Sequence, residues 1–109
     1  MSPNFTQTIT VRCSSPAKLI ELFAQWDRER ASGDLTGYMG ARVLADRERD
    51  GYFLILADFG VIDPNVSAAE EAARNNDLPE TRAMGAAVME ILDAPPEYHD
   101  FDEVYRTDF

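Results

Sequence analysis

Residues 52–59 read YFLILADF and hold the longest uninterrupted apolar run of the 109-residue sequence, Tyr52 to Ala57. In a strand, successive side chains point to opposite faces, so this run places apolar groups on both. One face carries Phe53, Ile55, Ala57 and Phe59, and the other carries Tyr52, Leu54 and Leu56. A strand that is apolar on both faces lies in the centre of its sheet and is covered on both sides.

A second strand precedes this one. Residues 37–46 predict a strand with Met39, Ala41 and Val43 on one face, and Asp50-Gly51 is a typical hairpin turn before residue 52. Residues 5–13, FTQTITVRC, alternate between two faces and predict another strand. Residues 97–108 alternate in the same way and predict a last strand, with His99 and Phe101 on one face.

Helix signals separate these strands. Ser14-Ser15-Pro16 supplies an N-cap and a proline at the first helical position, so we expect a helix over 16–31. Ser67 and Glu70 form a capping box that opens a short helix over 68–76. Pro79 opens a further helix over 79–93, and Pro95-Pro96 ends it.

The order of elements predicts one α+β domain, residues 1–109, with a ferredoxin-like βαββαβ fold and an extra helix before the last strand. Strands one and three lie in the centre, strand four flanks strand one and strand two flanks strand three. We expect the central strands to run parallel, which would bring Arg12 and Asp58 together. The helices cover one face only, so a second copy of the chain is predicted to cover the other.

The hairpin carries a family resemblance. Residues 37–44 read GYMGARVL, a charged turn follows, and residues 52–59 complete the hairpin. This arrangement resembles the central hairpin of antibiotic biosynthesis monooxygenase (ABM) domains, which belong to the dimeric α+β barrel proteins. The order of elements extends the similarity to nearly the whole chain.

The resemblance implies candidate activities. ABM-like enzymes include cofactor-independent monooxygenases of aromatic polyketides and haem-degrading proteins, with a pocket between the sheet and the helices of one subunit. That pocket commonly uses an Asn on the first strand and a Trp at the end of the third, where this chain has Ile9 and Phe59. The haem-degrading branch also uses a histidine on its later helical segment. The only histidine of this chain is His99, which lies after that segment. We therefore expect no haem and no other cofactor.

Two residues are candidates for catalysis. Cys13 ends the first strand and His99 begins the last, and alternation places both on the helix-covered face. A thiol beside an imidazole is the minimum for nucleophilic chemistry. The alternative is that Cys13 is a small buried apolar group.

Inward-facing side chains predict a ligand pocket between helices and sheet, suited to a flat apolar molecule. The alternative is a packed core without a cavity. Gln7 faces either this pocket or solvent, and Asn76 and Arg82 either hold a ligand at its mouth or cap the helix junction. The expected pocket residues are Phe5, Gln7, Phe23, Trp26, Tyr38, Phe59, Met84, Asn76 and Arg82.

Composition limits the partners. Asp and Glu number 20 against 10 Lys and Arg, a net charge of -10 that disfavours nucleic acid and anionic membranes. One cysteine and one histidine cannot form a zinc site alone, so no metal is expected. No segment resembles a signal peptide or membrane span, so we expect a cytoplasmic protein.

Three function classes therefore remain. The first is a cofactor-independent monooxygenase of a small aromatic compound. The alternatives are a non-catalytic small-molecule-binding module and a structural or assembly module that acts through the open sheet face. A titratable group deep in the pocket would favour the enzyme, and the lack of any cavity would favour the structural role.

Overall fold

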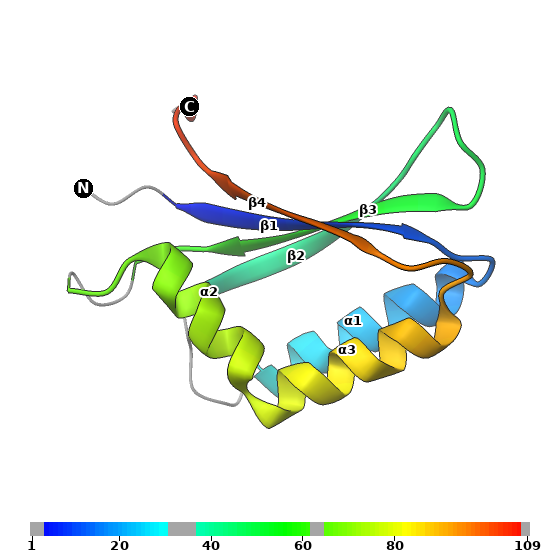
Figure 1. The fold of residues 1–109 in the computed structure, drawn as a ribbon, viewed down its shortest axis with the longest axis horizontal. Coiled ribbons are helices and arrows are strands. Elements are labelled where there is room, and N and C mark those ends of the chain that lie inside the picture. The colour runs from blue at the N-terminus through cyan, green and yellow to red at the C-terminus, as the bar shows by residue number, and fades with distance from the viewer. Residues whose placement is uncertain (1–3, 31–36, 62–64, 108–109) are drawn as a thin grey trace.

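The computed structural model describes residues 4–30, 37–61 and 65–107, which form a four-stranded sheet with three helices on one face (Figure 1). This arrangement confirms the predicted ferredoxin-like α+β fold with an extra helix before the last strand. The elements are β1 (Phe5–Arg12), α1 (Pro16–Arg30), β2 (Tyr38–Ala45), β3 (Tyr52–Phe59), α2 (Ala68–Asp77), α3 (Pro79–Ile91) and β4 (Glu97–Asp102).

The sheet has the predicted strand order, β2-β3-β1-β4, and every neighbouring pair is antiparallel. The expectation that β1 and β3 run parallel is therefore wrong. The crossover through α1 makes β1 and β2 parallel, and the hairpin after β2 reverses the chain, so β3 opposes both.

This direction separates Arg12 from Asp58. Arg12 lies opposite Tyr52 and Asp58 lies opposite Thr6, at the other end of the strand pair. The hydroxyl of Thr6 donates a hydrogen bond to the Asp58 carboxylate at 2.6 Å. The predicted Arg12–Asp58 ion pair is not formed within the chain.

A bulge at Met39 sets which side of β2 faces the helices. The register passes from Tyr38 opposite Phe59 to Gly40 opposite Asp58. Gly40 has φ +129°, a conformation open to glycine and rarely to other residues. The extra residue turns Tyr38 towards the helices and leaves Met39 59% exposed, so the expectation that Met39 shares a face with Ala41 is wrong.

The helices begin where the sequence predicts. The hydroxyl of Ser67 accepts a hydrogen bond from the Glu70 backbone at 3.1 Å, and the Glu70 carboxylate lies 3.4 Å from the Ser67 backbone nitrogen, so the capping box is confirmed. Helix α3 ends at Ile91 rather than at 93, because Leu92 turns to an extended conformation. The N–H of Asp93 then donates to the carbonyl of Arg12 at 2.8 Å and joins the chain to the end of β1.

Two clusters of buried side chains fill the space between helices and sheet. The larger, beneath α1 and α3, contains Val11, Cys13, Leu19, Ile55 and Val88. The smaller, beneath α2, contains Phe59, Ala68 and Ala72. Together they hold the three helices on one face of the sheet.

The other sheet face carries no helix (Figure 1). Alternation directs Leu54 and Leu56 of β3 to this face, where both are half-buried. Leu44 of β2 and Phe101 of β4 lie on the same face and are 42% and 54% exposed. We call this surface the open face.

Candidate ligand-binding site

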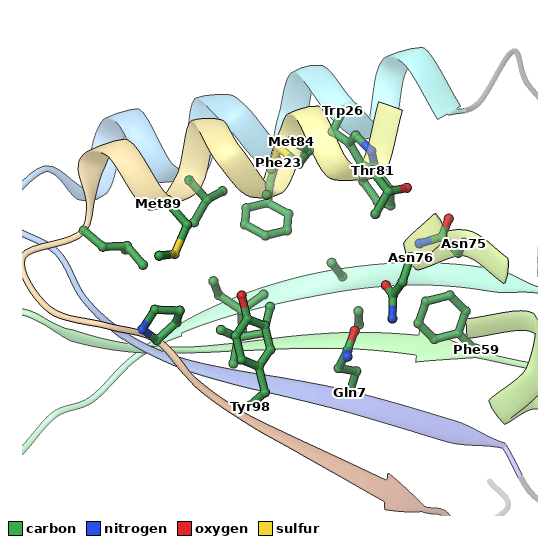
Figure 2. Close-up of a pocket in the computed structure, with 18 residues that line it drawn as sticks. Gln7, Phe23, Trp26, Phe59, Asn75, Asn76, Thr81, Met84, Met89 and Tyr98 are labelled. Carbon is green, nitrogen blue, oxygen red and sulfur yellow. The ribbon is translucent and has the colours of Figure 1, made fainter. Parts of the chain in front are cut away.

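A cavity of about 270 Å³ lies between the helix layer and the sheet (Figure 2). Its floor comes from all four strands and its roof from α1, α3 and the end of α2. The residues that line it are Gln7, Ile9, Phe23, Trp26, Ala41, Ile55, Ala57, Phe59, Asn75, Asn76, Thr81, Met84, Gly85, Val88, Met89, Leu92, Pro96 and Tyr98.

The sheet register explains why this space stays open. Ala41, Ala57 and Gln7 lie side by side on neighbouring strands, and two of the three are alanines. Larger side chains lie on both sides of this row: Tyr38, Phe59 and Phe5 on one side, and Val43, Ile55, Ile9 and Tyr98 on the other. The two alanines, between two rows of larger side chains, leave a volume beside Gln7 that the helices do not fill.

Aromatic rings surround one end of the cavity. Trp26 projects from α1 and Phe59 closes the end of β3, while Phe23, also on α1, lies nearer the middle of the cavity. The ring of Tyr38 meets Trp26 edge-on with centroids 4.7 Å apart and lies 5.8 Å from Phe59. Phe5 lies 6.4 Å from Phe59. Phe5 and Tyr38 were expected in the lining. They do not line the cavity themselves and instead pack against the rings of Phe59 and Trp26 that do.

Polar groups meet at this same end. Gln7 on β1 and Asn76 on α2 extend their amides towards one another from opposite walls, and Thr81 lies nearby on α3 (Figure 2). The Thr81 hydroxyl oxygen is buried and has no hydrogen-bond partner among the described residues. Of the two interpretations left open for Gln7 and Asn76, the structure favours the cavity.

The opposite end is apolar and opens to solvent. Met89 on α3 and Tyr98 on β4 lie on opposite walls, and they are 49% and 56% exposed. Leu92 and Pro96, close in sequence to Met89 and Tyr98, also line the cavity. The cavity therefore runs from a polar end at the junction of α2 and α3 to an apolar mouth. We call the polar end the inner end: Asn76 is exposed at its rim, and the hydroxyl oxygen of Thr81 is buried within it.

Comparisons with known proteins find no protein-family model and no curated protein that matches the sequence. Solved structures do match. A provisionally assigned antibiotic biosynthesis monooxygenase from Caulobacter crescentus gives a TM-score of 0.74 over 95% of this chain and 92% of its own, at 12% identity. SnoaB, a cofactor-independent oxygenase from Streptomyces nogalater, gives 0.70 over 97% of both chains at 17% identity. Rv0793 from Mycobacterium tuberculosis gives 0.69 over 96% and 99% at 11% identity.

The chain has an ABM-like fold. At such low identity the likeness concerns the fold alone, and the chemistry of the site has to be judged from its own residues. Ile9 and Phe59, the positions at which the family resemblance would place an Asn and a Trp, both line the cavity. An amide and an indole are nevertheless present, supplied by Gln7 on β1 and Trp26 on α1.

The predicted Cys13–His99 pair is wrong for this ABM-like chain. His99 lies opposite Thr8, so its side chain points to the open face, where Nε2 is 2.9 Å from a Glu97 carboxylate oxygen. Cys13 is buried on the helix side, and its thiol donates to the carbonyl of Ile91 at 3.4 Å. The two side chains lie on opposite faces of the sheet, and Cys13 is a small buried group.

Arg82 also lies outside the cavity. It is exposed, and its guanidinium Nη2 is 3.3 Å from the carboxylate of Asp77. Among the other expected pocket residues, Gln7, Phe23, Trp26, Phe59, Asn76 and Met84 do line the space. Asn75, also in the lining, is buried, and its carbonyl accepts a hydrogen bond from Leu78.

Sequence reasoning missed Tyr98, Thr81 and Met89. Tyr98 was missed because the sequence does not show which alternate residues of β4 face the helices. That becomes known only when the pairing of β4 with its neighbour is known. Tyr98 lies opposite Ile9 and shares its face, which settles the phase. Thr81 and Met89 lie on α3, three residues before and five residues after the expected pocket residue Met84.

The chemistry available in the cavity is that of neutral groups. Among the residues that line it, Tyr98 alone has a titratable side chain. Away from the cavity, in the β2–β3 turn, the hydrogen bond from the backbone N–H of Glu48, followed by that from the Arg49 side chain, lowers the pKa of Asp46.

The described residues contain no cluster of three or more His, Cys, Asp or Glu placed to hold a metal ion. Across residues 4–30, 37–61 and 65–107, no helix has the length and apolar character needed to cross a membrane. Neither finding changes the picture of a cavity built for neutral contacts.

Proposed function

We propose that this ABM-like protein binds a small, uncharged, planar molecule in the cavity. The observation that carries the proposal is the lining itself: apolar and aromatic walls, with the amides of Gln7 and Asn76 facing across one end. Binding sites for small molecules combine apolar walls with a few polar groups that fix orientation in this way. Aromatic walls favour aromatic ligands through offset and edge-to-face contacts.

The electrostatics favour a neutral ligand. No Asp, Glu, Lys, Arg or His lines the cavity within the described residues, so a buried charge would find no counter-ion. The net charge of -10 also repels anions from the surface as a whole.

The same proposal includes a homodimer. The open face exposes Leu44 and Phe101 beside the half-buried Leu54 and Leu56. The resemblance to dimeric α+β barrel proteins supports a second copy as the cover for this face. Two open faces packed together would bury these side chains.

Titration calorimetry with 2-naphthol tests the binding proposal. We expect saturable binding, accompanied by a shift of the Trp26 indole N–H resonance, since Trp26 lines the cavity and is the only tryptophan. Ala57→Phe should abolish binding because it fills the floor. Ala83→Phe, the same change at an exposed position of α3, should leave binding intact.

Two results would contradict the binding proposal. If folded wild-type protein takes up no 2-naphthol, or if Ala57→Phe and Ala83→Phe bind it equally well, the cavity is not the binding site. Circular dichroism on each variant establishes that the protein is folded in these comparisons.

A second candidate is oxygenation of the bound molecule without a cofactor. It is favoured by the structural similarity to SnoaB and by the presence of an amide, Gln7, and an indole, Trp26, in one cavity. Such chemistry begins by removing a proton from the substrate, which requires a base. Among the described residues that line the cavity, Tyr98 alone has a titratable side chain, and it lies at the mouth, so we favour binding without turnover.

Oxygen uptake separates the two candidates. With an anthrone as substrate, the binding proposal predicts consumption at the rate of the buffer alone. Uptake well above that rate, lost in Tyr98→Phe and in Ala57→Phe, would assign oxygenation to this cavity. Ala83→Phe is again the matched control, since its side chain lies outside the lining.

A further inference from the structure

We infer that the ligand is an uncharged alkyl-substituted phenol, with its hydroxyl at the inner polar end and its alkyl chain directed to the mouth. The inference rests on the proposed function, since it specifies what the same cavity holds and how. Three features carry it: the buried Thr81 hydroxyl, the apolar mouth and the small volume.

The inner end presents donors and acceptors together. Each amide, of Gln7 and of Asn76, offers a carbonyl oxygen and an NH₂ group, and Thr81 adds a hydroxyl. The Thr81 oxygen is buried without a partner among the described residues, which costs free energy unless a ligand group supplies one. A phenolic hydroxyl both donates and accepts, so a single such group can satisfy two of these side chains.

The outer end suits a flexible chain. Between the inner end and the mouth the roof carries Phe23, Met84 and Met89 (Figure 2), and Leu92 and Pro96 add further apolar groups to the lining. Methionine is unbranched and adapts its shape to its neighbour. The aromatic residues Trp26 and Phe59 gather at the inner end, so the ring of the ligand belongs there and the alkyl chain belongs outside it.

The volume limits the head group. The cavity holds about 270 Å³, slightly below the usual range for small-molecule sites, roughly 300–1,000 Å³. One ring with a short chain fits such a space more readily than a fused polycycle. A chain that leaves through the opening between Met89 and Tyr98 need not be short.

Alkyl esters of 4-hydroxybenzoic acid are suitable probes, because they carry a phenol at one end and an alkyl chain at the other. From methyl to butyl ester, calorimetry should show roughly a two- to fourfold gain in affinity for each methylene buried. The 4-hydroxybenzoate anion, which places a charge among apolar side chains, should bind at least tenfold more weakly than the methyl ester.

Removing one hydroxyl tests the orientation. Butyl benzoate lacks the phenolic group of butyl 4-hydroxybenzoate and is otherwise the same molecule. In Gln7→Leu the affinity for the phenol should fall roughly three- to tenfold, the value of one hydrogen bond, and the affinity for butyl benzoate should stay within twofold. Gln25→Leu, at an exposed glutamine on α1, should change neither affinity.

The outcomes separate the inference from the proposed function. If Gln7→Leu weakens both esters equally, or if the anion binds as well as the methyl ester, the inferred ligand class and orientation are wrong while binding in the cavity stands. If neither ester nor 2-naphthol binds the folded protein, both proposals fail. A loss confined to the phenol in Gln7→Leu, and repeated in Thr81→Val, supports the inference.

Discussion

The two faces of the sheet share the strand β3 and differ in what covers them. On the helix side, Ile55 and Phe59 are 0% and 1% exposed, while on the open face Leu44 and Phe101 are 42% and 54% exposed. The helix side is closed by the chain itself yet contains a cavity, because Ala41 and Ala57 are short. Among the described residues no helix covers the open face, and its side chains include leucines. An apolar surface can therefore serve either a ligand or a partner, and side-chain size decides which.

The largest expected effect concerns the open face. Leu56→Asp should raise the dimer dissociation constant roughly ten-thousandfold or more, because each of the two copies would bury an unpaired carboxylate at a cost of about 3–5 kcal/mol. Ile20→Asp, the same change on the exposed side of α1, should leave the dimer intact. Sedimentation velocity over a dilution series measures both. A wild-type chain that sediments as a 12.2 kDa monomer at micromolar concentration would contradict the assignment of this face to a partner.

The next effect compares the same substitution, phenylalanine to alanine, on the helix side and on the open face of the sheet. Phe59→Ala should lower the free energy of unfolding by about 3–5 kcal/mol, since it empties a buried site between Phe5, Tyr38 and α2. Phe101→Ala should cost below about 1 kcal/mol in dilute protein, where the open face meets water. Urea denaturation measures both. Equal losses at low concentration would mean that the open face is already covered by the chain.

The smallest effect concerns the cavity itself. Ala57→Val adds two methyl groups to a side chain that borders the cavity. We therefore expect the free energy of unfolding to rise by about 1 kcal/mol, instead of the usual penalty for enlarging a core residue. The same variant should bind 2-naphthol at least tenfold more weakly. Thermal unfolding and calorimetry give the two values. A destabilised Ala57→Val would show that the floor is already tightly packed.

The fold was predictable because its signals are local. The position of β3 follows from the apolar run Tyr52 to Ala57 and the Phe59 that continues its alternation. The starts of α1, α2 and α3 follow from Pro16, the Ser67 capping box and Pro79. Each depends on a few neighbouring residues and on backbone chemistry that operates whatever the tertiary structure. The strand order followed from the order of the elements.

The site was predictable in part. The inward orientation of Gln7, Trp26 and Phe59 was predictable, because each belongs to a strand or helix long enough for its periodicity to show which face is buried. All three line the cavity. The Cys13–His99 pair failed because the phase of β4 depends on its pairing with β1, which no local signal specifies. The cavity depends on the alignment of Ala41, Ala57 and Gln7 across three strands, a property of register.

Methionine methyl groups offer the most direct measurement of the central claim, that the cavity on the helix side is the binding site. Met84 and Met89 line it, whereas Met39 lies outside it at the bulge of β2 and is 59% exposed. With protein carrying ¹³C-methyl methionine and saturating butyl 4-hydroxybenzoate, we expect intermolecular NOEs from the ligand to the methyls of Met84 and Met89 and none to Met39. NOEs to Met39 alone, or none to Met84 and Met89 with ligand bound, would contradict the claim.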